Sequence, residues 1–272
     1  ELQEEFFSLP PVQSEIEVIK LPSWKKKSDF VAEEVPVALV YNGLSHVVMM
    51  CSPQHLKEFA VGFSISEGIV PDYSHIFDIE IKPGCHNGLV VEMEISPRCF
   101  WNLKDQRRSM AGRTGCGICG TENLDKVYKE VSRLPNTYTF DLKHYHFGLQ
   151  KIREAQQIGA ATGSMHAVAA LDSEGNFLGG IEDIGRHVAL DKVLGLKAIN
   201  NWKKEVLFLS SRASFEMVQK AAVSGIEIVF AISAPTNTAI ELARKANITL
   251  AAFCRENSAN VYTAPERLLG SF

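Results

Sequence analysis

The stretch that decides the fold is EVLFLSSRASFEMVQKAAVSGIEIVFAIS, residues 205–233. A short apolar run opens it, a polar turn follows, and the amphipathic segment SFEMVQKAAVSG then ends at Gly225. A second apolar run, IEIVFAIS, completes the stretch. Near-continuous apolar strands that alternate with helices are typical of parallel sheets covered by helices. The stretch therefore predicts an α/β fold.

The same alternation extends outward in both directions. Upstream, SMHAVAALDSEGNFLGGIED predicts a hairpin that turns at 172–176, and GRHVALDKVLGLKAI predicts a helix. Downstream, PTNTAIELARKAN predicts a helix and ITLAAFC a strand. We expect residues 141–272 to form an α/β/α layered domain with a mostly parallel sheet. Ligands of such sheets bind at the carboxyl ends of strands, which points to 210–214, 233–236 and 254–258.

The N-terminal part reads as two hairpins around a helix. Asn42-Gly43 separates two β-rich runs, and IEIKPGCHNGLVVEMEI predicts a second hairpin with its turn at 83–88. Between them, SPQHLKEFAVGFSISEG predicts a helix capped by Ser52, with apolar residues on one face: Leu56, Phe59, Ala60 and Phe63. The order ββαββ predicts a small α/β roll of the β-grasp kind over residues 1–110.

The connection between the two parts has little periodicity. Residues 96–113 follow neither the helical nor the strand period, so we expect a linker or mobile loop there. Helices are expected at about 123–133 and across HFGLQKIREAQQI, and WKKKSD is expected to be a solvated turn. Residues 111–140 are therefore expected to form a mobile loop and a connecting helix.

Composition limits the function classes. The 272 residues are 46% hydrophobic and 22% charged, which is typical of a soluble globular protein. A net charge of −4 argues against binding nucleic acid mainly through phosphate neutralisation. No apolar run reaches the roughly 18 to 20 residues that span a bilayer, and the N-terminus lacks the pattern of a secretory leader. We expect a cytoplasmic protein.

The connection contains GCGICG, residues 115–120, which combines G-x-G-x-x-G with C-x-x-C. A dinucleotide loop would follow an apolar strand, but polar residues precede this one. A structural zinc site needs a second ligand pair, which could come only from His144 and His146 or from another subunit. A dithiol redox pair and a mobile nucleophile both remain open. Arg113 and a helix start would lower the pKa of a thiol here, and such a thiol could carry sulfur as a persulfide.

Two polar turns between a strand and a helix complete the chemical pattern. The first contains Asp183, Arg186 and His187, and the second contains Ser211, Arg212 and Ser214. Each could also be structural, with Asp183 as a helix cap and His187 as a surface histidine. Together the two turns, each with one arginine, predict a cradle for phosphate or a nucleotide.

Six motifs in order now resemble the FdhD family of sulfur carrier proteins needed for formate dehydrogenase activity. They are CGICG, TGSMHAVAA, EDIGRHVALDKV, SSRASFEMVQKAA, SAPTNTAIELA and FCRENSANVYTAPERL. The resemblance implies a sulfurtransferase that takes persulfide sulfur from a cysteine desulfurase. It would pass the sulfur to the molybdenum cofactor, bis-molybdopterin guanine dinucleotide, before the cofactor enters formate dehydrogenase. It also implies a homodimer and a cytidine deaminase-like C-terminal domain.

Carried onto this chain, the resemblance makes Cys116 the persulfide cysteine and Cys119 its partner. It also assigns cofactor binding to the stretch Phe253, Cys254, Arg255, Glu256, Asn257 and Ser258. From residue type and position we expect Arg186 and Arg212 to bind phosphates and Asp183 to accept from a guanine edge, while His166, His187, Ser211 and Ser214 line the pocket. GDP would then mimic one end of the cofactor.

The sequence departs from the family at two positions and from zinc deaminases at two motifs. Ser164 replaces a usual glycine and Val188 a usual asparagine, which concerns the pocket wall near His166 and the start of the helix. Zinc deaminases carry a glutamate two residues after the helix-opening histidine and a later C-x-x-C. Ala189 and the stretch 211–214 stand at those places here, so we expect no catalytic metal.

Overall fold

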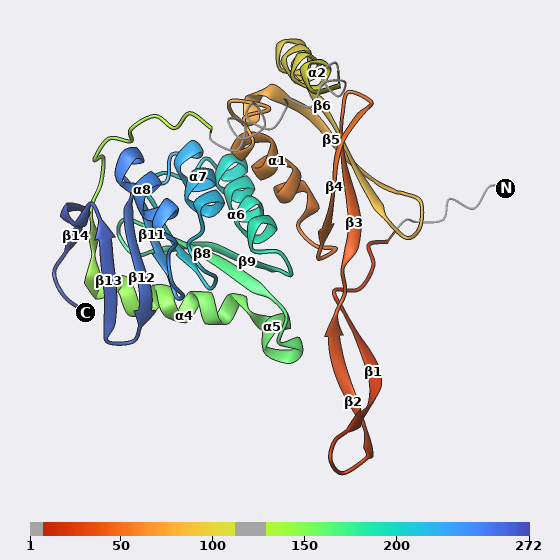
Figure 1. Cartoon of the computed structure of the whole chain (residues 1–272), viewed down its shortest axis with the longest axis horizontal. Coiled ribbons are helices and arrows are strands. Elements are labelled where there is room, and N and C mark those ends of the chain that lie inside the picture. Colours follow the sequence, from red (N-terminus) through yellow and green to blue (C-terminus); the bar gives the residue numbers. More distant parts are fainter. Residues whose placement is uncertain (1–7, 112–128) are drawn as a thin grey trace, which may run out of the picture.

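The computed structural model describes residues 8–111 and 129–272 (Figure 1). Cys116 and Cys119 lie outside these residues. A projecting arm, an N-terminal roll and a larger C-terminal layered part follow one another along the chain (Figure 1). None of the helices in the described ranges is both long and apolar enough to cross a membrane.

The N-terminal roll has the predicted ββαββ order. Its strands are β3 (Val35–Tyr41), β4 (Leu44–Cys51), β5 (Ile76–Pro83) and β6 (Leu89–Ile95), with α1 (Leu56–Ser66) between the hairpins. They form a four-stranded sheet in the order β4-β3-β6-β5, in which β3 and β6 are parallel. Asn42 and Gly43 both have positive φ, as the tight turn of the first hairpin requires.

The start of α1 differs from the prediction. The helix begins at Leu56 with His55 as its N-cap, and Ser52 is instead buried with its backbone N–H donated to Asp183. The expected apolar face is confirmed, because Leu56, Phe59 and Phe63 are all buried against the sheet.

The stretch after β6 was expected to be a loop and is a helix. Pro97–Ala111 forms α2, starting with proline in its first turn, where the missing N–H costs no hydrogen bond. Cys99 and Leu103 bury one narrow stripe, and the rest of the helix is largely polar. So few buried positions leave little periodicity in the sequence. The helix expected at about 123–133 is absent from its described part, 129–133, which is irregular.

The C-terminal part has three layers around a six-stranded sheet. Its strands are β8 (His166–Asp172), β9 (Phe177–Asp183), β10 (Glu205–Leu209), β11 (Ile228–Ala231), β12 (Thr249–Arg255) and β13 (Ser258–Thr263), in the order β13-β12-β11-β10-β8-β9. Four strands run in one direction, but only the β10–β11 and β11–β12 pairs are parallel neighbours, so the sheet is mixed and not mostly parallel as expected. Only β8 and β13 run the opposite way, because hairpins join them to β9 and β12. A short pair, β7 (Phe140–Asp141) and β14 (Leu268–Leu269), lies beside this sheet.

Helices cover both faces of this sheet (Figure 1). One face carries α6 (Arg186–Asn200), α7 (Phe215–Val223) and α8 (Asn237–Ala246), and the other carries α4 (Tyr145–Ala155) and α5 (Gln157–Thr162). On the α4 side, Phe208 and Phe230 stack with ring centroids 4.9 Å apart, and Tyr145 packs against them. The coarse prediction of a mixed α/β fold is confirmed.

The roll and the layered part meet where α1 crosses α6. A Cβ atom added to Gly62 would lie 1.6 Å from the backbone oxygen of Asp191, and one added to Gly195 would lie 1.8 Å from that of Glu58. The glycines therefore let the two helix backbones touch, and Val188 of α6 joins the core of the roll. The predicted boundaries at 110 and 140 stay predictions, because the two parts share this packing.

This contact gives a test of stability. Gly195→Ala should lower the free energy of unfolding by about 2 to 3 kcal/mol or more. The new methyl group would overlap the backbone of Glu58 and force α1 away from α6. Urea denaturation of the purified variant would measure the loss. Asn200→Ala, at the exposed end of the same helix, should shift the value by less than about 0.5 kcal/mol. Equal stabilities for both variants would contradict the close approach.

Candidate functional site

The strand directions bring nearly all predicted binding residues to one edge of the six-stranded sheet. The carboxyl ends of β9, β10, β11 and β12 meet there, together with the first residue of β8, His166. Neighbouring strands lie about 4.8 Å apart, so the edge from β9 to β12 extends for roughly 19 Å. Such an edge suits an elongated ligand with several polar groups. We call it the sheet edge.

Two helix N-termini lie at the sheet edge. Gly185 is the N-cap of α6 and Ser214 the N-cap of α7, and neither helix has a capping hydrogen bond from a side chain. The first backbone N–H groups of a helix and its dipole attract anions. The hydroxyl of Ser214 and the Nε of Arg186 are buried polar atoms without a hydrogen-bond partner among the described residues. Both are therefore donors available to a ligand oxygen.

Arg212 and Ser211 occupy the turn between β10 and α7. The Arg212 side chain is exposed, whereas Ser211 is buried and its hydroxyl donates 3.1 Å to the carbonyl of Arg212. The turn with Arg186 follows β9 and the turn with Arg212 follows β10. Because β9 and β10 both border β8, the two turns lie near each other at the sheet edge.

Two histidines at this edge have lowered pKa values, which favour the neutral form of the ring. Burial lowers the pKa of His166, and the nearby positive charge of Arg186 lowers it further. Burial also lowers the pKa of His187, even though the Glu216 carboxylate, 2.5 Å from Nε2, favours the charged ring. A neutral imidazole keeps both a donor and an acceptor, so these rings can bind polar groups without adding charge.

Asp183 does not face the sheet edge. The side chain is completely buried; its Oδ2 accepts from Lys192 Nζ at 2.6 Å and from the Ser52 backbone, and its Oδ1 accepts from Gly185 N. The expected direct contact between Asp183 and a guanine base does not fit this burial. The carboxylate instead fixes the β9–α6 turn and ties it to the N-terminal roll.

The stretch 253–258 turns from β12 into β13 at the far end of the edge. Phe253 has φ of 52°, which a residue with a side chain rarely adopts, and the residue is 42% exposed. Cys254 is buried, and burial raises the pKa of its thiol to about 11, so it is a packing residue and not a nucleophile. Arg255 donates to the backbone oxygens of Ile232 and Cys254, while Glu256, Asn257 and Ser258 are exposed.

Replacing Phe253, whose backbone is strained, should have opposite effects on stability and on nucleotide binding. Phe253→Gly should keep or raise the free energy of unfolding, by up to about 1 kcal/mol, because glycine adopts positive φ without strain. The same change should weaken nucleotide binding if the exposed ring stacks on a base. Thermal unfolding and calorimetric titration with GDP would measure the two effects. Asn201→Gly, at a left-handed position at the other end of α6, should leave binding unchanged.

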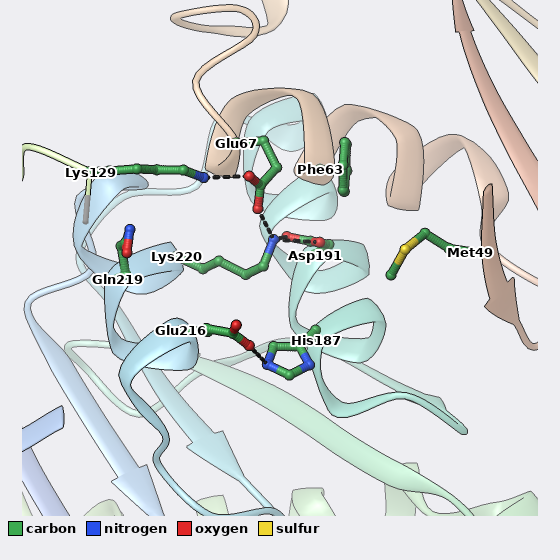
Figure 2. A pocket seen from close by; sticks show the side chains of 9 residues that line it. All are labelled: Met49, Phe63, Glu67, Lys129, His187, Asp191, Glu216, Gln219 and Lys220. Atoms are coloured by element: carbon green, nitrogen blue, oxygen red, sulfur yellow. Dashed lines mark hydrogen bonds and ion pairs between the residues drawn. The ribbon is translucent and has the colours of Figure 1, made fainter. Parts of the chain in front are cut away.

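A cavity of about 300 Å³ lies next to this edge and is lined mainly by residues of α1, α6 and α7 (Figure 2). Its upper wall is a cluster of charges. Lys220 Nζ donates to both oxygens of Asp191 at 2.9 and 3.0 Å, to Glu67 at 2.9 Å and to the Ser66 hydroxyl. Burial alone would lower the pKa of Lys220, but the carboxylates of Asp191 and Glu67 raise it above the usual value. Each charge in this cluster is therefore paired.

Lys129 connects this cavity to the next part of the chain. Its Nζ lies 2.5 Å from Glu67, and it is the first described residue after the stretch that contains Cys119. His187 and Glu216 form the lower wall, so the cavity joins Lys129 to the helix starts at the sheet edge (Figure 2).

Sequence reasoning missed the residues of this charge cluster. Asp191 lies in the buried middle of α6, and Lys220 falls on the buried face of α7. Charged residues at buried helical positions are rare unless they are paired. That pattern could have identified them, although their partners in α1 could not be read from the sequence.

The comparisons with known proteins agree with this architecture. A model of the FdhD/NarQ family matches residues 32–269. The fold is similar to that of a crystal structure described as a formate dehydrogenase accessory protein from Desulfotalea psychrophila, with a TM-score of 0.75 and 24% sequence identity. That similarity covers 95% of this chain and 99% of the other.

Proposed function

The chain belongs to the FdhD/NarQ family, and from this premise we propose that it is a sulfur carrier in the maturation of formate dehydrogenase. In this proposal a cysteine desulfurase supplies persulfide sulfur. The acceptor is bis-molybdopterin guanine dinucleotide bound at the sheet edge, and formate dehydrogenase then receives the cofactor. We also propose that the carrier acts as a homodimer, with a β-grasp-like roll and a cytidine deaminase-like layered part.

The observation that carries the binding part of the proposal is the pair of unsatisfied donors at the sheet edge. Arg186 Nε and the Ser214 hydroxyl are buried without partners, beside two helix N-termini and the exposed Arg212. Phosphate oxygens are acceptors that would satisfy them, and arginine binds phosphate with paired N–H groups. The length of the edge also suits a dinucleotide better than a single phosphate. These residues therefore fit the cofactor as substrate.

The chemistry assigned to the cysteines is a two-step relay. The Cys116 thiolate attacks the outer sulfur of the desulfurase persulfide; a new S–S bond forms and the desulfurase thiolate leaves. The Cys119 thiolate then attacks Cys116 Sγ, so that a Cys116–Cys119 disulfide forms and hydrosulfide leaves for the metal. The dithiol supplies the two electrons that reduce the sulfur, and an external thiol reductant restores the pair. Both residues lie outside the described structure, and their roles rest on the C-x-x-C motif and the family.

A nucleotide titration tests the binding part. Arg212→Ala should weaken GDP binding by roughly tenfold to a hundredfold, because a charged hydrogen bond to phosphate is lost. Isothermal titration calorimetry would measure this. Arg244→Ala is the matched control, since Arg244 is an exposed arginine in the last turn of α8, away from the edge. An unchanged affinity in Arg212→Ala would place the nucleotide elsewhere.

A second candidate is a chaperone that holds the cofactor without transferring sulfur. The donors and helix N-termini at the sheet edge would serve this function equally well. The two functions separate on one measurement: a chaperone would keep formate dehydrogenase active when both motif cysteines are replaced, whereas a carrier would not.

A further inference from the structure

Helix α2 presents an exposed face with a large aromatic side chain at its centre. Cys99 and Leu103 mark the buried side of the helix, and at about 100° per residue Trp101 lies on the opposite side. Trp101 is 55% exposed, whereas tryptophan is highly buried on average. The Nζ of Lys104 lies 4.8 Å from the centroid of one of its rings. Exposed tryptophan beside a cation is typical of a residue that anchors a protein interface.

The same face of α2 is basic. The helix contains four basic residues and one acidic residue, although the whole chain has a net charge of −4. Arg98 and Lys104 flank Trp101 on its two sides. Among the described residues, the Arg98 guanidinium has no ion pair and no hydrogen bond. An uncompensated cation beside an exposed aromatic ring favours a partner that carries carboxylates.

A cavity of about 490 Å³ borders this face on the side of Arg98. Arg98, Cys99 and Asn102 form one wall, and the stretch 68–71 after α1 forms another, together with His75. The cavity therefore offers both apolar surface and hydrogen-bonding groups to a side chain that enters from outside. We call Arg98, Trp101, Asn102 and Lys104, with this cavity, the α2 surface.

The α2 surface is close to Cys116 along the chain. Cys116 follows the last residue of α2, Ala111, by five positions, so at no more than about 3.6 Å per residue it lies within roughly 18 Å of that end. Lys129, at the other cavity, follows Cys116 by thirteen positions, which allows up to about 47 Å. The α2 surface shares no residue with the sheet edge. A protein bound to α2 would therefore be close to Cys116 without occupying the cofactor site.

A second group of lysines lies on the arm, which consists of β1 (Gln13–Lys20) and β2 (Lys25–Ala32), paired antiparallel. Its lysines at 25–27 are exposed near the tip. The arm points away from the body of the molecule, and α2 lies at the opposite end of the roll (Figure 1). Charge alone does not select between these two surfaces, but the short connection to Cys116 selects α2.

We propose that the α2 surface is the docking site for the cysteine desulfurase, and that an acidic segment of that enzyme lies along it. The proposal rests on the sulfur-carrier function, because only a carrier needs a donor next to Cys116. Carboxylates of the donor pair with Arg98 and Lys104, and an apolar side chain packs on Trp101. The interface then has an aromatic anchor at its centre and charges at its rim, as protein interfaces commonly do.

Binding of purified cysteine desulfurase to the whole chain tests the docking site. Arg98→Glu/Lys104→Glu should raise the dissociation constant by at least about tenfold, because like charges then meet across the interface. Trp101→Ala should raise it by about tenfold or more, because the anchor is lost. Biolayer interferometry would measure both effects, and the wild-type affinity should fall as the salt concentration rises.

Two charge reversals serve as matched controls. Arg244→Glu/Lys245→Glu changes two exposed positions of α8, and Lys25→Glu/Lys27→Glu changes two exposed positions of the arm. Both should bind the desulfurase as the wild type does. GDP binding should survive in every variant, which shows that the fold is intact.

Sulfur loading from two donors separates a failed docking site from a failed relay. Arg98→Glu/Lys104→Glu should load Cys116 slowly from the desulfurase but normally from inorganic tetrasulfide. In that reaction the Cys116 thiolate takes one sulfur atom and trisulfide leaves, so no docking is needed. The mass of the Cys116 peptide measures both reactions.

Several outcomes would overturn the docking site. If the α2 reversal binds the desulfurase with wild-type affinity, or if only the arm reversal weakens binding, the donor docks elsewhere and the relay stands. Binding of α2 to anionic lipid vesicles, with unchanged affinity for the desulfurase, would also refute the proposal. A wild type that gains no sulfur on Cys116 from either donor would overturn the relay itself, and the docking site with it.

Discussion

Replacement of Cys116 by alanine is expected to abolish sulfur loading. After incubation with a cysteine desulfurase and cysteine, the wild-type peptide containing Cys116 should gain about 32 Da, the mass of one sulfur atom, and the variant should gain nothing. The reason is chemical: a persulfide needs a thiolate as attacking nucleophile, and alanine has none. Mass spectrometry of the digested protein under non-reducing conditions measures the adduct directly.

The other cysteines make this test specific. Cys85→Ala is the matched control, because Cys85 is an exposed thiol of the roll, remote in sequence from the motif. It should load sulfur as the wild type does. Cys119→Ala should still load sulfur but release it slowly, so the adduct should accumulate on Cys116. Full loading in Cys116→Ala would refute the assignment, and formate dehydrogenase that stays active without both cysteines would establish the chaperone function instead.

Lys220→Met is expected to cause the largest loss of stability, about 3 to 5 kcal/mol, as for other buried ion pairs that lose one partner. Asp191 is buried and would keep its charge next to an apolar side chain (Figure 2). Burial already raises the pKa of Asp191, and without Lys220 this pKa should rise further. Urea denaturation would measure the loss, with Lys245→Met, at an exposed position of α8, as the control.

The pH dependence of this variant has a definite sign. In the variant, native Asp191 binds a proton over a pH range in which the unfolded chain does not. Stability therefore falls as pH rises from the unfolded pKa of about 3.9 to the raised native pKa. The gap between wild type and variant should shrink on acidification toward pH of about 4. In Lys220→Met/Asp191→Leu most of the loss should be recovered, because no unpaired buried charge remains. A loss that persists in this double variant would mean that packing, not charge, determines the effect.

Local patterns in the sequence predicted most elements of the fold. Asn42-Gly43 indicated the first hairpin because only a tight turn with positive φ suits that pair, and the alternation after residue 205 indicated the helix-covered sheet. The failures have physical causes as well. α2 buries too few residues to show a period, and the arm alternates weakly because most of its residues are exposed among the described parts of the chain.

The sequence could predict which residues of the candidate site lie at the ends of neighbouring strands. Arg186, Arg212 and Ser214 lie together because β9 and β10 run in the same direction on either side of β8. Asp183 has the same place in the sequence pattern but points into the core, where Lys192 and Ser52 bind it. A strand end shows which edge a residue occupies, but its side-chain direction depends on contacts far away in the chain.

The glycine contact between α1 and α6 also governs how the protein folds during synthesis. The face of α1 that contains Gly62 packs on α6, and it leaves the ribosome before any residue of α6. Gly62 has no backbone to pack against until Gly195 and its neighbours have been translated. Contacts between such distant segments form slowly, and apolar surface that waits for a partner is prone to aggregation. The N-terminal roll produced alone should therefore require a chaperone that shields α1, whereas the whole chain supplies that shield itself.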